Sequence, residues 1–391
     1  MRIGVDATCW ANQRGYGRYA RHIVGAMVEA SPLDEFVCFL DELSAANFSL
    51  DQPNVRRVIV KTSAGAAAAA SADGSRSLSD MFAMTRAVWR NRVDVFYSPS
   101  VYTYFPLPPG LPAIVTIHDA IADRFPELTL PSPRARFFWR AKNWLAHWQA
   151  RSILTVSDYA AGEVSRQHGV TLSKIDVTLE GPAPAFRPID QSKTNEVAAR
   201  HGIPIGATWF IYVGGFNPHK HVVSIVAAHG ELSKTLAGGG PRLLLVGNAS
   251  SDVFHSEVNV IRAMIEKCGT ESTVDWLGYV EDGELAALLS GAIALVLASE
   301  SEGFGLPAIE AAACATPVIA TTESPLPDLL RGGGLFVPPG DSTAIVAAMK
   351  LLLNDPQFRN KCGQTALEQA QKLSWEKSAD ICLAAIRKAA A

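Results

Sequence analysis

Short apolar runs alternate with helix-length amphipathic stretches along the whole chain, and this alternation constrains the fold more than any other feature. Such a pattern is typical of parallel strands that are joined by crossover helices. The strands predicted in the first half are Arg2–Asp6, Glu35–Leu40, Val55–Val60, Val93–Tyr97, Ala113–Thr116 and Ser152–Val156. Those predicted in the second half are Thr208–Val213, Arg242–Val246, Val274–Leu277, Ala294–Ala298, Pro317–Ala320 and Gly334–Val337. The repeat of one pattern predicts an α/β fold built from two similar domains.

The length of the chain and a proline-rich segment near its middle place the domain boundary. At roughly 150 residues per domain, a chain of 391 residues exceeds one ordinary core. The segment Glu180–Pro188 can sustain neither a helix nor an inner strand, because each proline lacks an N–H donor and restrains its predecessor. We predict Rossmann-like domains over residues 1–184 and 190–374, with a C-terminal helix over 375–391 that packs back on the first. The segment Thr62–Ser79 is predicted to be a mobile loop, with a packed helix as the alternative.

Composition excludes several classes of protein. A hydrophobic fraction of 48% with 19% charged residues describes a soluble globular chain. The formal net charge of -3 provides no overall field for a polyanion, so no nucleic-acid partner is expected. The six cysteines form no CxxC pair and are predicted to be reduced thiols, mostly in cores. Because no apolar leader opens the chain and no uncharged run approaches roughly 20 residues, we predict a cytoplasmic protein.

The segment that directly follows the predicted strand Ala294–Ala298 is the most informative part of the sequence. Pro307 suits the first turn of a helix, so Glu302–Leu306 is predicted to form a loop at the carboxyl end of the strand. Glu310 then lies about one turn into the helix. Unpaired N–H groups at a helix start, together with glycines that let a ligand approach the backbone, form a seat for phosphate.

A carboxylate on either side of that seat suits a sugar nucleotide. Glu302 and Glu310 can accept hydrogen bonds from two hydroxyl-bearing groups that a diphosphate separates, such as a sugar and a ribose. The alternative is that Glu302 is a solvated loop residue and that Glu310 only stabilises the first turn of the helix.

Glu302 to Glu310 resembles the E-x7-E signature of the retaining GT-B glycosyltransferases of family 4. Further motifs that are similar to those of this family follow in its order along nearly the whole chain. They are Gly15–Tyr19, Thr116–Asp119, Thr155–Asp158, Tyr212–Lys220, Trp276–Val280, Glu302–Pro307, Thr316–Ile319 and Ser324–Asp328. Three residues depart from the family's pattern: Ala315 stands for a frequent glycine, His219 for a common basic residue and Asp328 for a glutamate. The second departure is expected to reduce contacts with a diphosphate.

The resemblance implies a GT-B architecture, in which two Rossmann-like domains face each other across a cleft. It implies a nucleotide-sugar-dependent hexosyltransferase (EC 2.4.1.-) that binds its donor to the second domain and a saccharide or lipid-linked acceptor to the first. No cofactor and no metal are expected, because lysine and helix dipoles supply the positive charge. Similarity around His118, Lys220 and Glu302 favours a mannosyltransferase that uses GDP-mannose in surface polysaccharide biosynthesis.

The same resemblance implies roles for individual residues. His118, Glu302 and Lys220 are the implied catalytic residues, and Lys220 would contact the donor diphosphate, with an exposed helix-start lysine as the alternative. The implied donor-binding residues are Gly214, Gly215, Lys220, Gly247, Tyr279, Val280, Glu302, Gly303, Phe304, Gly305, Leu306 and Glu310. The implied acceptor-side residues are Gly15, Tyr16, Gly17, His118 and Asp119.

Two features of the first half have competing interpretations. Gly15–Ala20 matches G-x-G-x-x-A, but several residues separate it from the strand Arg2–Asp6, whereas a dinucleotide fingerprint turns directly off its strand. It is instead interpreted as a glycine loop that overhangs the cleft and in which Gly17 permits close backbone approach, with a plain turn as the alternative. His118 is interpreted as a group that stabilises charge at the anomeric carbon, or as a structural histidine, while Asp119 orients its loop.

A basic aromatic helix is predicted over Pro133–Trp148. Helical spacing places five apolar residues on one face: Phe137, Ala141, Trp144, Leu145 and Trp148. Basic residues flank this face: Arg136, Arg140, Lys142 and Arg151. The helix either lies peripherally on the cytoplasmic face of an anionic membrane or packs its aromatic face into the core.

Three other functions remain as alternatives to a glycosyltransferase. A GT-B relative with another reaction, such as a sugar-nucleotide epimerase or a phosphorylase, would not transfer a sugar to a second saccharide. A catalytically silent nucleotide-binding module would bind a nucleotide without turnover. A dinucleotide-dependent oxidoreductase would bind NAD(P)H.

Overall fold

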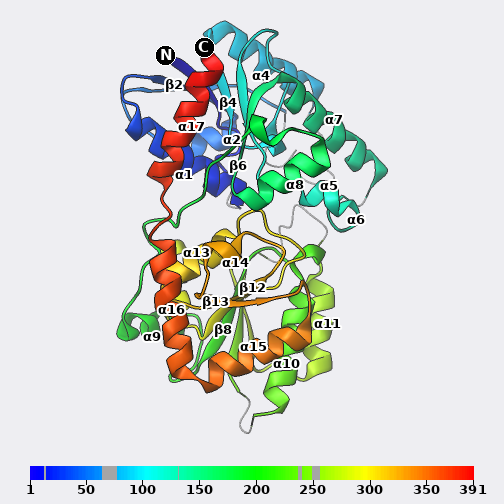
Figure 1. Ribbon diagram of the computed structural model, residues 1–391, viewed down its shortest axis with the longest axis vertical. Coiled ribbons are helices and arrows are strands. Elements are labelled where there is room, and N and C mark those ends of the chain that lie inside the picture. Colours follow the sequence, from blue (N-terminus) through cyan, green and yellow to red (C-terminus); the bar gives the residue numbers. More distant parts are fainter. Residues whose placement is uncertain (13–14, 64–76, 131, 237–239, 249–255) are drawn as a thin grey trace. The chain divides into compact units, whose positions relative to one another are not determined.

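The computed structural model describes residues 1–12, 15–63, 77–130, 132–236, 240–248 and 256–391. The chain divides into two compact units (Figure 1). Unit 1 comprises Met1–Glu180 and Ser374–Ala391, and unit 2 comprises Gly181–Leu373. The loop predicted over Thr62–Ser79 falls mostly on residues 64–76, which lie outside the described residues.

Unit 1 is built on a parallel sheet of seven strands in the order β3-β2-β1-β4-β5-β6-β7. The strands are β1 (Arg2–Asp6), β2 (Glu35–Leu40), β3 (Val55–Ile59), β4 (Val95–Ser98), β5 (Ala113–Thr116), β6 (Ala150–Thr155) and β7 (Ile175–Val177). The first six were predicted from their apolar runs, within two residues at each end. The order reverses between β1 and β4, so the sheet is doubly wound.

Helices cover both faces of this sheet. They are α1 (Gly15–Ala30), α2 (Glu42–Ala46), α4 (Leu78–Asn91), α5 (Ile121–Arg124), α6 (Pro126–Thr129), α7 (Pro133–Gln149), α8 (Asp158–His168) and α17 (Trp375–Ala390), with the 3-10 turns η1 (Val101–Thr103) and η2 (Leu172–Lys174). α1 and α17 pack together on one side, while α4, α7 and α8 contribute to a core on the other (Figure 1). This arrangement follows from right-handed crossovers, which change face where the strand order reverses.

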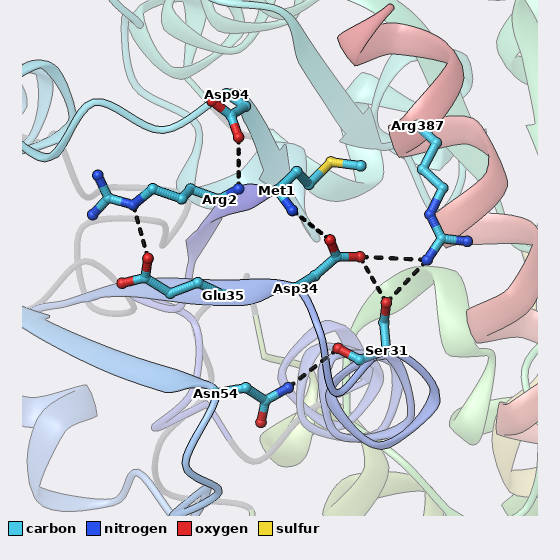
Figure 2. Close-up of polar contacts among 8 residues, drawn as sticks. All are labelled: Met1, Arg2, Ser31, Asp34, Glu35, Asn54, Asp94 and Arg387. Atoms are coloured by element: carbon cyan, nitrogen blue, oxygen red, sulfur yellow. Dashed lines mark hydrogen bonds and ion pairs between the residues drawn. The ribbon is translucent and has the colours of Figure 1, made fainter.

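The C-terminal helix α17 is held to unit 1 by a network of polar contacts (Figure 2). The Nη2 atom of Arg387 donates to Ser31 Oγ at 2.9 Å and lies 3.3 Å from Asp34 Oδ2. Asp34 also accepts from the Met1 amino group at 2.6 Å and from Ser31 Oγ at 2.6 Å. Burial alone would raise the pKa of Asp34, but the hydrogen bonds from Met1, Ser31 and Arg387 outweigh it and hold the pKa below its usual value. The two ends of the chain therefore meet on one carboxylate.

Unit 2 repeats the design with a parallel six-stranded sheet in the order β10-β9-β8-β11-β12-β13. The strands are β8 (Trp209–Val213), β9 (Arg242–Val246), β10 (Val274–Gly278), β11 (Ala294–Leu297), β12 (Val318–Thr321) and β13 (Gly334–Val337). The helices are α9 (Gln191–Arg200), α10 (Val222–Lys234), α11 (Val258–Cys268), α12 (Asp282–Ser290), α13 (Leu306–Ala313), α14 (Leu326–Leu329), α15 (Ser342–Asn354) and α16 (Pro356–Ala370), with the 3-10 turn η3 (Pro218–Lys220). The sheet reverses its order between β8 and β11, and open α/β sheets bind ligands at such a point.

All six cysteines are free thiols, as predicted. Five of them are buried, and Cys268 is partly buried.

Candidate functional site

The predicted donor residues of unit 2 gather at the carboxyl ends of adjacent strands. Lys220 ends η3, which follows β8, and Glu302 lies in the loop that follows β11. β8 and β11 are hydrogen-bonded neighbours, and the strand order reverses between them. Two residues that are 82 positions apart in the sequence are thereby brought to the switch point of the sheet.

Lys220 and Glu302 form an ion pair at this point. The Nζ atom of Lys220 lies 2.7 Å from Glu302 Oε1, and the two side chains are 19% and 11% exposed. Ser299 Oγ donates a second hydrogen bond to the same carboxylate oxygen, at 2.6 Å. An ammonium carries three N–H donors, and the pair with Glu302 uses one of them. The geometry therefore places a cation and an oriented carboxylate side by side, a suitable arrangement for a phosphate and the hydroxyls of an attached sugar.

Backbone contacts fix the loop that carries Glu302. The amide of Glu300 donates to the carbonyl of His219 at 2.7 Å, and the amide of Glu302 donates to the carbonyl of Glu323 at 3.0 Å. His221, which adopts a left-handed conformation with φ 51°, lies with its Nε2 atom 2.8 Å from Glu300 Oε2. These contacts tie the end of η3 to the loop after β11, so the Lys220–Glu302 pair is held by its scaffold.

The helix α13 begins directly after this loop. Gly305 precedes it with φ 85°, and a Cβ atom there would lie 2.8 Å from Leu326 Cδ1, so only glycine fits. Pro307 occupies the first turn, as the sequence predicted. Glu310 is 2% exposed and Glu302 is 8% exposed. The expectation that Glu302 is a solvated loop residue is therefore wrong, and both carboxylates are buried in this structure.

The other predicted donor residues follow neighbouring strands of the same sheet edge. Gly214 and Gly215 follow β8, Gly247 follows β9, and Tyr279 and Val280 follow β10. The amide of Gly214 donates to the carbonyl that ends β9, and the amide of Gly247 donates to the carbonyl of the last residue of β10. Tyr279 is 57% exposed, whereas Val280 is buried with Phe304 and Leu306. Val280, Phe304 and Leu306 can shape this edge of the sheet, but they offer a ligand their backbone rather than their buried side chains.

In unit 1, His118 follows β5 and lies in a buried setting. Its ring meets that of Tyr19 edge-on, with the centroids 4.7 Å apart. Among the described residues, neither of its ring nitrogens has a hydrogen-bond partner. Burial lowers the pKa of His118 to about 3, so the imidazole is neutral at physiological pH. Asp119 Oδ1 accepts the amide of Ile121 at 2.9 Å, which holds the turn into α5.

The glycine motif near the start of unit 1 differs from its predicted form. Gly15, Tyr16 and Gly17 form the first turn of α1 and not an overhanging loop. A Cβ atom on Gly17 would lie 2.0 Å from the carbonyl oxygen of Asn12, so internal packing already requires glycine there. Asn12 Nδ2 donates to Tyr16 Oη at 2.6 Å. The glycine at position 17 is therefore explained by the packing of the segment that leads into α1.

The basic aromatic helix α7 also differs from one of its two predicted forms. It packs inward through Trp139, Asn143 and Ala146. Four aromatic side chains are exposed: Phe137 (67%), Phe138 (49%), Trp144 (66%) and Trp148 (71%). The interpretation that the aromatic face is core is wrong, because a different stripe of the helix faces the sheet.

A cavity of about 580 Å³ occupies the opposite edge of the unit 1 sheet. It lies at the amino ends of β4 and β5 and is lined by the end of α4 and by residues 108–112. It contains no residue of the predicted site, which lies at the carboxyl edges.

Ser299 is a site residue that sequence reasoning missed. It precedes Glu302 by three residues in the sequence, but no pattern predicts that its hydroxyl hydrogen-bonds the carboxylate of Glu302.

Comparison with known sequences places the chain in a family. Residues 193–369 match the family described as glycosyl transferases group 1, and residues 15–181 match glycosyltransferase family 4. The chain belongs to the family 4, group 1 glycosyltransferases. One relative is the O-antigen chain mannosyltransferase B of Escherichia coli, which is 28% identical over 72% of this chain and 71% of its own length. Another is a D-inositol 3-phosphate glycosyltransferase of Segniliparus rotundus, which is 29% identical over 72% of this chain and 62% of its own length, less than two thirds of it.

Solved structures of other proteins have the same fold. A sucrose-phosphate synthase from Thermosynechococcus elongatus has a TM-score of 0.75 and 20% identity, covering 99% of this chain and 98% of its own. Anabaena HepE, in complex with UDP and glucose, has a TM-score of 0.74 and 16% identity, covering 98% of each chain. The glycosyltransferase therefore has the GT-B fold. No helix in the described part of the chain is long and apolar enough to span a bilayer.

Proposed function

We propose that this glycosyltransferase transfers a hexose with retention of anomeric configuration, and that its donor is GDP-mannose. The Lys220–Glu302 pair at the switch point of unit 2 carries the proposal. The relative that is named an O-antigen chain mannosyltransferase supports mannose as the sugar and a surface glycan as the product. The acceptor is a saccharide or a lipid-linked saccharide.

The donor would lie along the carboxyl edge of the unit 2 sheet. Lys220 meets the diphosphate with the N–H donors that Glu302 does not use, and Glu302 holds hydroxyls of the donor sugar. Because the sugar is bonded directly to the diphosphate, the groups that bind the sugar and the diphosphate must be adjacent. Lys220 and Glu302 meet this condition, since their charged atoms lie 2.7 Å apart. Glu310 holds the ribose, and the amides at the start of α13 complete the diphosphate seat.

The transfer itself needs charge stabilisation at two atoms. The bond between the anomeric carbon and the diphosphate oxygen breaks, the acceptor oxygen attacks on the same face, and its proton passes to the departing phosphate. Lys220 and the helix dipole stabilise the charge that grows on the diphosphate, so no metal ion is needed. The proposed catalytic role of His118 is carried by a neutral imidazole or its backbone carbonyl, because burial lowers the pKa of the ring to about 3 and a protonated ring would repel a cation-like sugar.

Unit 1 is proposed to meet the acceptor and to contact the membrane peripherally. The acceptor-side residues around His118 follow β5 at the carboxyl edge of its sheet. The exposed aromatic residues of α7 supply the contact with a membrane that presents a lipid-linked acceptor.

The test is mannosyl transfer by Glu302→Gln and Glu310→Gln, with Glu284→Gln on α12 as a matched control. Glutamine preserves shape, which matters because both site carboxylates are buried. Losing a charged hydrogen bond costs about 1.5–3 kcal/mol, so each site variant should transfer roughly 10- to 100-fold more slowly. The control should retain its rate, because Glu284 pairs with Arg200 and His201 and is not one of the donor-site residues. Site variants that are as active as the control would refute the assignment, and a product of inverted configuration would refute retention.

A further inference from the structure

The exposed tryptophan and phenylalanine side chains of the described residues cluster on two helices of unit 1. Among the described residues, every exposed tryptophan and phenylalanine lies on α4 or α7. They are Phe82, Trp89, Phe137, Phe138, Trp144 and Trp148. Such clustering is not the scatter of single apolar residues that ordinary surfaces show, and it marks an interaction surface.

The spacing of these residues makes a stripe on each helix. On α4, Leu78, Phe82 and Trp89 lie four and seven residues apart, with Leu78 81% exposed, so they share one face. On α7, Phe137, Trp144 and Trp148 lie seven and four residues apart. The rings of Trp144 and Trp148 are parallel, with their centroids 6.1 Å apart. Each helix thus carries an outward apolar ridge of large side chains.

The two ridges belong to the same side of unit 1. Met84 and Val88 of α4 share a core with Trp139 and Ala146 of α7, so both helices pack on one face of the sheet (Figure 1). The intervening segment bridges them. Thr85 on α4 donates to the carbonyl of residue 106 at 2.6 Å, and Gln149 at the end of α7 donates to that of residue 107 at 2.9 Å.

The charges on this surface have one sign. Arg86 and Arg90 are exposed on α4, and Arg134 and Arg140 are exposed on α7. α7 contains no acidic residue, and the one acidic residue of α4, Asp80, is buried and accepts two hydrogen bonds from Ser63. This excess of positive charge occurs in a chain whose formal net charge is -3.

We propose that α4 and α7 together form a docking surface for an anionic lipid bilayer, the α4–α7 surface. This deepens the peripheral contact proposed above, and it rests on that proposal. Tryptophan rings suit the boundary between head groups and acyl chains, and the arginines suit anionic head groups. A second copy of the chain does not fit this surface, because a symmetric dimer would place arginine against arginine with no carboxylate on either helix to match it.

The test is co-sedimentation of the full chain with vesicles of phosphatidylcholine, with and without phosphatidylglycerol. Binding should require the anionic lipid and should weaken as salt rises. Removing two arginines, in Arg134→Gln/Arg140→Gln, should lower the partition coefficient about fivefold per residue at low salt. The matched charge control is Arg331→Gln, which removes an arginine of unit 2 whose side chain is 79% exposed.

The aromatic residues of the two helices are tested separately. Trp144→Ala/Trp148→Ala and Phe82→Ser/Trp89→Ser should each lower the partition coefficient at least about tenfold, because each removes two large apolar groups. The control is Ile205→Ser in unit 2, where an isoleucine that is 90% exposed lies outside the surface. All these side chains are exposed, so the midpoint of thermal unfolding should stay unchanged.

Three results would overturn membrane docking altogether. The first is that the chain does not bind anionic vesicles at low salt, and the second is that the control variants lose as much binding as the surface variants. The third is that the chain forms a dimer instead of binding vesicles, and that Trp144→Ala/Trp148→Ala abolishes this dimer. A loss from the α7 pair without one from the α4 pair would overturn the two-helix surface. The thermal shift of the same samples with GDP-mannose reports on unit 2, so failure of the α4–α7 surface and failure of the proposed donor are distinguishable.

Discussion

Replacing the two members of the Lys220–Glu302 pair, singly and together, should reveal strong coupling between them. Their side chains are 19% and 11% exposed, so each charge is largely withdrawn from water. Removing one partner of a fully buried pair costs about 3–5 kcal/mol. The residual exposure and the Ser299 hydrogen bond reduce this, and we expect roughly 2 kcal/mol for Glu302→Gln and somewhat more for Lys220→Met. The double variant leaves no uncompensated charge, and its loss should be smaller than the sum.

The assay is calorimetric unfolding of the four proteins. For a unit of this size, about 2 kcal/mol corresponds to a lowering of the melting midpoint by roughly 4–8 °C. The Lys193–Glu196 pair on α9 is a matched control in the same unit, with the same charges at 2.9 Å but side chains that are 50% and 56% exposed. Its coupling should be much weaker, because water and salt screen an exposed ion pair. Additive losses at Lys220 and Glu302, or coupling no larger than in the control, would refute the view that this pair is a desolvated unit.

Two further predictions concern metal and pH. Transfer should persist after exhaustive chelation, because Lys220 and the start of α13 supply the positive charge. This mechanism would be rejected if a chelator abolished the activity and manganese or magnesium restored it. His118 has a pKa that burial lowers to about 3, so the folded state binds fewer protons than the unfolded chain between pH 3 and the ordinary value of 6.5. The contribution of the neutral His118 to stability is complete above pH 6.5 and is lost as the pH falls. The free energy of unfolding of His118→Asn should therefore fall less steeply than that of the wild type between pH 6.5 and 4. An equal fall in both proteins, measured by denaturation at each pH, would contradict this.

The sequence predicted the strands well because each buried strand is a compact apolar run. The strand β7 was missed since Ile175–Val177 is only three residues long and carries a central aspartate. The face of α7 that packs against the sheet could not be predicted from the sequence either. Its aromatic spacing is as regular as that of a core helix, and only tertiary packing determines that Trp139 points inward while Trp144 points outward.

The site shows the same division between local and tertiary information. The loop from Glu302 and the helix start at Pro307 follow from local rules, because proline and glycine fix the backbone there. The direct pair of Glu302 with Lys220 depends on the order of β8 and β11, which the sequence does not state. The burial of His118 likewise comes from the packing of α1 against its loop, through Tyr19.

Binding of sugar nucleotides to the full chain tests the central claim most directly. A ligand that binds only the folded state stabilises it by about 2.7 kcal/mol at a hundredfold excess over its Kd, which should raise the melting midpoint by several degrees. We predict the largest shifts with GDP and GDP-mannose among a panel that includes UDP-glucose, UDP-GlcNAc and UDP-galactose, and loss of most of the shift in Lys220→Ala. A larger shift with uridine nucleotides would contradict the mannosyl assignment. No shift with any nucleotide well above millimolar concentration would contradict the donor site at the Lys220–Glu302 pair.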